Sequence, residues 1–454
     1  MAERDIIVAP ATPSGGAIAI IRVSGKGSIE LCDKLFIASS RRSLLEAKGQ
    51  TLHYGQVRDG ERIIDDVLLS LFRAPASYTG EDSVEISCHG SSYITQEIIN
   101  LTLRHGARIA EGGEFTMRAY LSGKMDLSQA EAVADIIAAS SAAAHAMATT
   151  QMRGGYSEAL ASLRGELIRL STLLELELDF SDEDVEFADR SELLSLIDHI
   201  AGEIKSLAES FALGNAIKSG VAVAIVGRPN AGKSTLLNRL LREDRAMVSD
   251  IAGTTRDVIE ECINYDGITF RFIDTAGIHA TEDRLEQMGI DRTMRAMGGA
   301  QIIVQLIDGS DVEALTNFTP IDHSPSQRLL IVVNKIDLLS SDLSFDNLTS
   351  LSPINISAKD GNGIERLLKA LSETIDRSAI FNGSPIVSSA RHYNHLCDAL
   401  ASLLASKIAL QNNIPTDLLC EDLRQVVHHI GEITGTITTD EILGSIFSGF
   451  CIGK

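Results

Sequence analysis

The segment GRPNAGKS, residues 227 to 234, constrains the fold more than any other part of this sequence. It fits the pattern G-x-x-x-x-G-K-[ST] and lies between an apolar run, VAVAIV, and a helix-like run, STLLNRLL. In such a loop, glycines let backbone N–H groups curl around phosphates, Lys233 supplies a positive charge to the β and γ oxygens, and Ser234 offers a hydroxyl to magnesium. The segment therefore predicts a strand, a phosphate-binding loop and a helix, in that order.

Between about residues 220 and 380, apolar runs alternate with loops and helical patterns. Continuous apolar strands joined by crossover helices are typical of a parallel sheet that is covered on both faces. We therefore predict an α/β unit whose strands are the runs VAVAIVG, ITFRFIDT, QIIVQLIDG, RLLIVVNK and SPINISA.

Three shorter motifs follow the phosphate loop in the order that a nucleotide site requires. DTAG, residues 274–277, ends a strand, where Asp274 suits a water-mediated magnesium contact and the Gly277 N–H suits the γ-phosphate. NKID, residues 334–337, ends another strand, and the Asp337 carboxylate matches the N1–H and amine edge of guanine. SAK, residues 357–359, would close over the base. Together these motifs predict GTP as the nucleotide rather than ATP.

The segment SDIAGTTRD, residues 249–257, lies between the phosphate loop and Asp274, and its hydroxyls suit the magnesium shell. Ile278 follows the DTAG glycine at a position where many such proteins carry a water-orienting glutamine. The motifs alone therefore leave open which group aims the attacking water.

The regions around the α/β unit have two other textures. Residues 1–120 mix short strand-like runs with one helix-like stretch, SYITQEIINLTLRHG, which Gly106 closes, and they predict a small α+β domain. Residues 121–215 and 383–454 have helical spacing of apolar residues. The second helical piece is short for a core of its own, so we expect the two pieces to pack together, with residues 216–382 as an inserted domain.

Composition limits the possible partners and the compartment. The net charge of -22 argues against a surface built to grip nucleic acid over its whole area, so any nucleic acid must meet a local patch or a partner. Six cysteines without a CxxC pair, and an N-terminal stretch unlike a signal peptide, favour a reducing cytoplasm. No apolar run predicts a membrane span, and AVADIIAASSAAAHAMA, residues 132–148, is better interpreted as a packed helix.

Two groups of histidine and cysteine have loose metal-ligand spacing: His392, His395 and Cys397, and the adjacent pair Cys88 and His89. Neither has a second pair of ligands at the spacing of a zinc site, so we do not expect bound zinc.

The phosphate loop with Asn230, together with GTTRD, DTAG, NKID, the flanking helical pieces and the terminal FCIGK, resembles the MnmE (TrmE) family of tRNA-modification GTPases over the whole chain. The resemblance implies an N-terminal folate-binding and dimerisation domain, a discontinuous helical domain and an inserted P-loop GTPase domain. It also implies a homodimeric, potassium-activated GTPase that works with the FAD-dependent protein MnmG. The pair would add a carboxymethylaminomethyl or aminomethyl group at C5 of the wobble uridine of certain tRNAs, with the carbon taken from methylene- or formyl-tetrahydrofolate.

The resemblance also implies roles for individual residues. Potassium would be bound by Asn230, Ser249, Ile251 and Thr254, and magnesium by Ser234 and Thr255. Glu286 would orient the water, with Lys233 and Asn230 as the other catalytic residues, and this would answer the question raised by Ile278. The GTP-contacting set implied by motifs and resemblance is Asn230, Ala231, Gly232, Lys233, Ser234, Thr235, Ser249, Asp250, Ile251, Ala252, Gly253, Thr254, Thr255, Asp274, Thr275, Ala276, Gly277, Asn334, Lys335, Asp337, Ser357, Ala358 and Lys359.

For the folate site, the resemblance implies the residues Arg22, Glu85, Lys124 and Lys454. Cys451 lies fourth from the end of the sequence, but Gly453 and Lys454 fit a prenylation signal poorly, so we reject lipidation. A thiol near a one-carbon carrier could be a nucleophile, whereas a lone cysteine is more often a small buried residue, and a positional or auxiliary role is the preferred interpretation.

Two other classes of protein share the GTPase motifs. A ribosome-assembly switch of the Era or Der type usually carries a basic RNA-binding module, whereas acidic residues outnumber basic ones after residue 386 in this chain. A dynamin-like membrane scaffold would need a basic amphipathic stretch, which is absent from the sequence.

Overall fold

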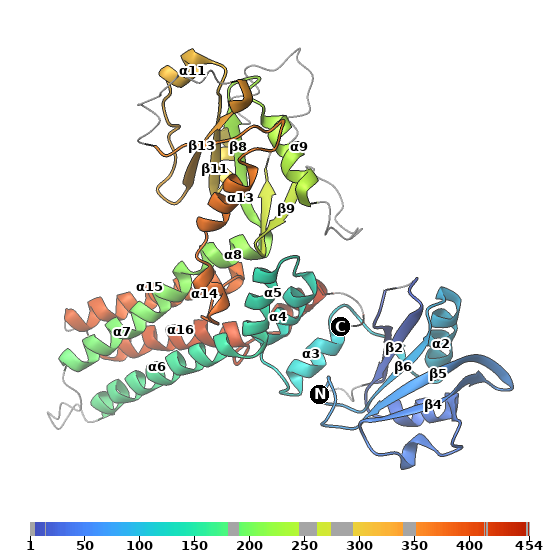
Figure 1. Cartoon of the computed structure of the whole chain (residues 1–454). Helices are drawn as coiled ribbons and strands as arrows, with labels where there is room; N and C mark the ends of the chain where they lie inside the picture. The colour runs from blue at the N-terminus through green and yellow to red at the C-terminus, as the bar shows by residue number, and fades with distance from the viewer. Residues whose placement is uncertain are drawn as a thin grey trace. The chain divides into compact units, whose positions relative to one another are not determined.

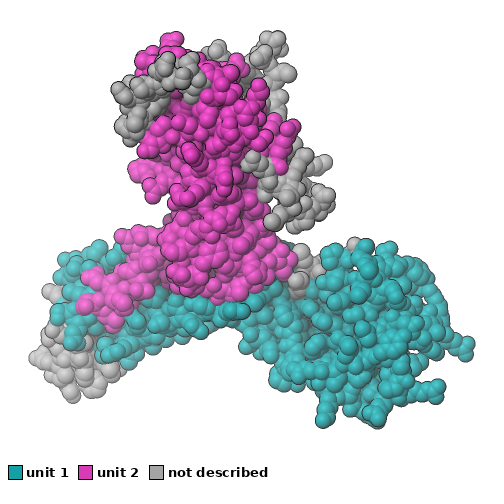
Figure 2. All heavy atoms as spheres, viewed as in Figure 1, with its two compact units in different colours: residues 1–134, 151–194, 402–454 teal, residues 135–150, 195–401 magenta. Residues whose placement is uncertain are grey.

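The computed structural model describes residues 5–13, 15–179, 190–244, 261–273, 294–338, 351–412, 414, 416–450 and 453 (Figure 1). The chain forms two compact units (Figure 2). Unit 1 comprises residues 1–134, 151–194 and 402–454, and unit 2 comprises residues 135–150 and 195–401.

The N-terminal part of unit 1 is built on a seven-stranded sheet in the order β3-β4-β5-β6-β2-β1-β7. All neighbouring strands are antiparallel except β1 and β7. Its elements are β1 Ile7–Pro10, β2 Ile18–Ser24, α1 Ser28–Leu35, β3 Phe36–Ala38, η1 Leu44–Glu46, β4 Thr51–Asp59, β5 Arg62–Phe72, β6 Ser83–His89, α2 Ser92–Arg104, β7 Arg108–Ile109 and α3 Glu114–Leu121.

Alternation along the strands separates the two faces of this sheet. On β2, Ala19, Ile21 and Val23 are buried in a core with apolar side chains of α1 and α2. The intervening positions, Ile18, Ile20 and Arg22, point to the other face and are exposed or partly exposed. The α+β domain predicted from the sequence is confirmed. Gly106 follows the end of α2, as predicted, and has a left-handed backbone with a φ of 103°.

The helical part of unit 1 contains long helices from both ends of the sequence. Helix α6 packs along α16, so chain segments on either side of residues 195–401 lie side by side (Figure 1). The remaining helices belong to unit 1 or to unit 2 according to their residue numbers, and they are α4 Leu127–Ala138, α5 Ala142–Met152, α6 Gly155–Asp179, α7 Arg190–Glu209, α8 Phe211–Ser219, α14 Arg377–Phe381, α15 Ala390–Gln411, α16 Thr416–Thr434 and α17 Asp440–Ser448.

The single packed helix expected over residues 132–148 is wrong in one respect. The structure has two helices there, α4 and α5, with a break at residues 139–141. The physical reason is a local cap, since the Ser141 hydroxyl accepts from the Ala144 N–H at 3.1 Å and starts a new helix. Periodicity alone did not separate them because apolar residues continue through the break.

The sheet of unit 2 has six strands in the order β13-β12-β11-β8-β10-β9. It is parallel, as predicted, except that the edge strand β9 runs antiparallel to β10. Its elements are β8 Val221–Gly227, α9 Lys233–Asp244, β9 Glu261–Tyr265, β10 Ile268–Phe272, β11 Ile302–Asp308, α11 Val312–Thr316, β12 Arg328–Asn334, η4 Ile336–Leu338, β13 Ile354–Asn355 and α13 Ile364–Glu373.

Both faces of this sheet are covered. Val304 of β11 packs in a core with α9 and α13, whereas Ile303 points to the other face and packs with Met297 and Ala300. Strands buried on both faces explain why the sequence of β11 and β12 is almost continuously apolar. The carboxyl ends of β8, β11 and β12 consequently share one edge, where the loops of the predicted nucleotide site begin.

Candidate functional site

The predicted phosphate loop joins β8 to α9, as the sequence indicates. Two residues of the loop have left-handed backbone conformations, Asn230 with a φ of 63 and Gly232 with a φ of 97. A Cβ atom at Gly232 would lie 2.2 Å from the Nδ2 atom of Asn334. Only glycine therefore fits this position, because any side chain would collide with a neighbouring motif as well as strain the backbone.

The Lys233 side chain lies over its own loop. Its Nζ donates to the carbonyl oxygens of Gly227 at 2.8 Å and Arg228 at 3.0 Å. Burial lowers the pKa of this ammonium, since no anion among the described residues neutralises it. An anion at the start of α9 would supply the missing counter-charge, which is the electrostatic requirement of a phosphate site.

Asn334 connects three of the predicted motifs. It is buried at the end of β12, and its Nδ2 donates to the carbonyl of Ala231 at 2.9 Å. Its Oδ1 accepts from the N–H of Ala358 at 2.9 Å. The phosphate loop, NKID and SAK are therefore held together by one side chain, and Asn334 has a structural role beyond any contact with a base.

The base-side loops are ordered by short internal contacts. The Ser357 hydroxyl donates to the Asp360 carboxylate at 3.2 Å and accepts from the Asp360 N–H at 3.2 Å. The Ser357 carbonyl accepts from the Gly361 N–H at 2.8 Å. Asp337, the residue predicted to read guanine, is exposed. The structure thus brings together the predicted residues 230–235, Asn334, Lys335, Asp337 and 357–359 at one edge of the sheet.

Several predicted site residues lie outside the residues that the structure describes. They are Ser249, Asp250, Ile251, Ala252, Gly253, Thr254, Thr255, Asp274, Thr275, Ala276, Gly277, Glu286, Cys451 and Lys454.

In the N-terminal sheet, Arg22 and Glu85 face each other across β2 and β6 in register. The Arg22 Nε donates to Glu85 Oε1 at 2.9 Å. The guanidinium carbon lies 5.2 Å from the ring centre of Tyr78 and 5.5 Å from that of Phe115, and Nη1 lies 3.5 Å from the Gly453 carbonyl. Arg22 is thereby held in one orientation by a carboxylate, two aromatic rings and the C-terminal backbone.

Lys124 belongs to the same neighbourhood through the loop that precedes β6. Its Nζ donates to the Pro75 carbonyl at 2.9 Å, and Tyr78 of that loop lies against Arg22. The loop is fixed by a bond of 2.8 Å between the hydroxyls of Ser24 and Thr79. Sequence reasoning missed Tyr78, Phe115 and Thr79, since no motif marks them and their contacts depend on strand order.

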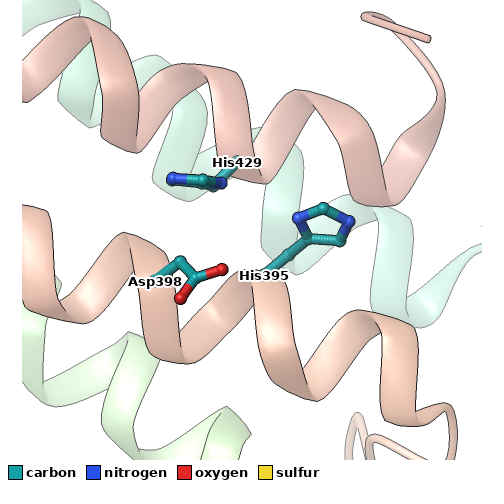
Figure 3. A group of neighbouring side chains, drawn as sticks. All are labelled: His395, Asp398 and His429. Carbon is teal, nitrogen blue, oxygen red and sulfur yellow. The ribbon is translucent and has the colours of Figure 1, made fainter. Parts of the chain in front are cut away.

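The two groups of histidine and cysteine that sequence spacing suggested have different surroundings in the structure. Cys88 is buried in β6, and burial raises its pKa, whereas the neighbouring His89 is exposed and pairs with Asp65 at 2.8 Å. Consecutive strand residues point to opposite faces, so this pair cannot share one ion. On α15, Asp398 follows His395 by about one turn and lies on the same side of the helix (Figure 3). On α16, the Nδ1 atom of His429 lies 3.8 Å from the Oε2 atom of Glu432.

Among the described residues, none of the helices combines the length and the apolarity that crossing a membrane would require.

Two family models and several named proteins are similar to this chain. A family model of the MnmE helical domain matches residues 127–451, and a model of the GTP-binding protein TrmE N-terminus matches residues 6–124. The tRNA modification GTPase MnmE of Christiangramia forsetii is 50% identical over 474 residues, covering 100% of both chains. Proteins of the same name from Flavobacterium psychrophilum and Bacteroides fragilis are each 49% identical, again over 100% of both chains.

Proposed function

The chain belongs to the MnmE family of tRNA modification GTPases, and we propose that it uses GTP hydrolysis to organise a folate-dependent modification of the wobble uridine. It is a GTP-hydrolysing tRNA modification enzyme with GTP and Mg²⁺ as its nucleotide and metal. The proposal depends mainly on the 50% sequence identity to a tRNA modification GTPase over the full length of the chain. It is supported by the phosphate loop, NKID and SAK, which meet through Asn334.

For the nucleotide, we propose that Lys233 and the N–H groups at the start of α9 bind the phosphates, and that Asp337 reads guanine. Ser234 and Thr255 would hold magnesium, with Asp274 acting through water. When bound, the divalent ion neutralises charge on the β and γ oxygens. The described part of this set fits a bound nucleotide, because the N–H groups and the Lys233 ammonium at the start of α9 suit phosphate oxygens and the Ser234 hydroxyl suits magnesium.

Potassium activation is proposed from the family resemblance, with Asn230 as a ligand together with Ser249, Ile251 and Thr254. The exposed Asn230 side chain forms no hydrogen bond with any described residue, so its carbonyl oxygen is available to a cation. A monovalent cation between phosphates stabilises charge that develops in the transition state. Glu286 would orient the water through a second water, and its replacement by alanine should end potassium-stimulated hydrolysis while GTP affinity stays near normal.

The folate site is proposed around Arg22, Glu85, Lys124 and Lys454. A carboxylate such as Glu85 can pair with the edge of a pterin ring, and cationic groups suit the glutamate tail. The pair Arg22–Glu85 is partly exposed, so a ligand can reach it. The aromatic rings of Tyr78 and Phe115 pack against the Arg22 guanidinium, and this packing supports a preorganised site. The C-terminal Gly453 carbonyl close to Arg22 supports a contribution from the chain end, where Lys454 and Cys451 lie.

A homodimer is proposed through the N-terminal domain. The exposed face of the N-terminal sheet carries a row of paired positions, Tyr54, Leu68, Ser87 and Ile20, beside the row that contains Glu85 and Arg22. The Tyr54 residue is 58% exposed and the Leu68 residue is 43% exposed, which is a large exposed fraction for big apolar side chains on a strand. Covering this face by a second copy would bury apolar area next to the proposed folate site.

We further propose domain limits at residues 1–120, 121–215, 216–382 and 383–454, with the packing of α6 against α16 as support for a discontinuous helical domain. The FAD-dependent partner would be MnmG, and the product a carboxymethylaminomethyl or aminomethyl group at C5 of the wobble uridine. The net charge of -22 fits a protein that leaves much of the tRNA grip to this partner. We propose a cytoplasmic location, which fits tRNA as the substrate.

The decisive experiment is mass analysis of wobble nucleosides in tRNA from a strain that lacks this chain. We expect loss of the modified uridine and its return with the wild-type chain. The Lys233→Ala variant should not restore it, whereas Lys205→Ala, at an exposed position of α7, should restore it fully. Unaltered nucleosides in the deletion strain would refute the proposed function.

A further inference from the structure

A carboxylate outside the sequence motifs touches the nucleotide site. Asp308 is the last residue of β11, and it pairs in register with Asn334 at the end of β12. Its Oδ2 lies 2.6 Å from Nζ of Lys335, and both side chains are partly buried. Asp308 is thus the anionic partner of the lysine in the NKID motif.

The backbone of Lys335 makes this contact possible. Lys335 has a φ of 61, a left-handed conformation that a lysine rarely adopts. The flanking backbone is fixed on both sides, since Gly309 N donates to the Asn334 carbonyl at 2.7 Å and Ile336 N donates to the Ile356 carbonyl at 3.2 Å. The direction in which the Lys335 stem leaves the chain is therefore determined by three neighbouring strand ends.

Asp308 is itself held in place. Its Oδ1 accepts from the N–H of Ser310 at 2.9 Å and from the Ser310 hydroxyl at 2.6 Å. Burial alone would raise the pKa of Asp308, but the hydrogen bonds from Lys335 and Ser310 outweigh it, and the pKa is lowered. The carboxylate is consequently ionised at neutral pH and divides its two oxygens between a turn and a lysine.

We propose that Asp308 is a positioning residue for guanine nucleotides, which fixes the Lys335 ammonium so that the methylene stem of Lys335 forms a wall for the base. The inference rests on the guanine site proposed above. A long flexible lysine loses conformational entropy when it orders against a ligand, and a partner that orders it beforehand lowers this loss. The wall contacts the face of the ring, so it serves any purine with equal effect and leaves the reading of the base edge to Asp337.

The test is a double-mutant cycle on the affinity for a fluorescent GDP analogue, measured with the full chain. Asp308→Asn keeps an acceptor for Ser310 and removes the charge beside Lys335, and we expect affinity to fall about tenfold, as for the loss of a charge-assisted hydrogen bond. Lys335→Met keeps the stem and should weaken binding to a similar or greater extent. The double variant should be no worse than Lys335→Met alone.

Ser310→Ala is the matched control, because it alters the other contact of the same carboxylate and leaves the bond to Lys335 intact. We expect it to bind as the wild type does. Additive losses in the double variant, or a loss in Ser310→Ala equal to that in Asp308→Asn, would overturn the proposal, since Asp308 would then act through the turn.

Competition with IDP adds a second readout. Asp308→Asn should weaken GDP and IDP by the same factor, whereas a change in their ratio would show that Asp308 acts on Asp337 and would contradict the inference. The inference alone fails if Lys335→Met weakens binding and Asp308→Asn does not. Wild-type protein that binds no guanine nucleotide would instead refute the proposed GTP site.

Discussion

Arg118 and Glu114 lie one turn apart on α3 and form an ion pair of 2.8 Å in which each side chain is only 5% exposed. Arg118 also reaches Glu81 at 3.2 Å and the carbonyl of Asp5 at 2.9 Å. It therefore ties α3 to the chain start and to the loop that carries Tyr78. The same helix supplies Phe115 beside Arg22 and Thr116, whose hydroxyl meets that of Tyr78 at 2.9 Å.

Replacing Arg118 with methionine should destabilise the N-terminal domain strongly. The substitution leaves the buried Glu114 with Arg108 as its remaining cation and removes the guanidinium from the partly buried Glu81, and the loss of one partner from a buried ion pair costs up to about 3–5 kcal/mol. We expect the free energy of unfolding to fall by this amount in urea denaturation. Lys205→Met is the control, because Lys205 and Glu209 form an exposed pair at 3.7 Å and should change stability by about 0.5 kcal/mol or less.

Acid should weaken the same domain. Burial by itself would raise the pKa of Glu114, but hydrogen bonds from Arg108, the Glu111 N–H and Arg118 outweigh it and hold the pKa below its usual 4.5. Arg108 likewise lowers the pKa of Asp5 from 3.8. A depressed carboxyl pKa stabilises the fold above the unfolded value, and this stability is lost as the pH falls through the folded value.

We therefore expect the urea midpoint to fall as the pH is lowered below about 4.5, and to fall less steeply in Glu114→Gln. At neutral pH the variant should be less stable than the wild type, and the gap should narrow in acid. A gap that stays constant over the whole pH range would contradict a role for the Glu114 charge.

Folate binding should depend on Glu85. In Glu85→Gln, the carboxylate that pairs with Arg22 and would pair with a pterin edge is lost, so calorimetry with 5-formyltetrahydrofolate should show affinity reduced about tenfold or more. GTP turnover should stay unchanged. Asp66→Asn is the control on the same sheet face, since the Asp66 carboxylate accepts a hydrogen bond of 2.9 Å from the Gln56 side chain and lies in a different strand pair from Arg22 and Glu85. Unchanged affinity in Glu85→Gln would remove the folate assignment.

Hydrolysis should require potassium and Asn230. A cation that takes the place of an arginine finger contributes about 10³–10⁵ in rate, so sodium, which is smaller, should leave the wild type nearly inactive. Asn230→Ala in potassium should fall to the rate that the wild type shows in sodium. Asn238→Ala, an exposed position on α9, should hydrolyse normally. Equal wild-type rates in the two salts would exclude potassium activation.

Much of the fold was predictable because its signals are local. The strand, loop and helix around Lys233 follow one another within the chain, and the apolar runs that became β8, β11 and β12 were identified from composition. The edge strand β9 and the break between α4 and α5 were not predicted from the sequence, because a short half-exposed strand and a serine cap barely change the hydrophobic pattern. Asn334 was predicted from its motif, but its bridge between Ala231 and Ala358 was not.

The sequence by itself determined which chemical groups the nucleotide site contains and the order in which the chain presents them, because each motif is a few consecutive residues whose backbone geometry is set locally. Only the tertiary structure decided which distant residues meet. Arg22 faces Glu85 because β2 and β6 are neighbours in register, and Asp308 reaches Lys335 because β11 and β12 end side by side. Strand order and register arise from packing of the whole core, and no short stretch of sequence encodes them.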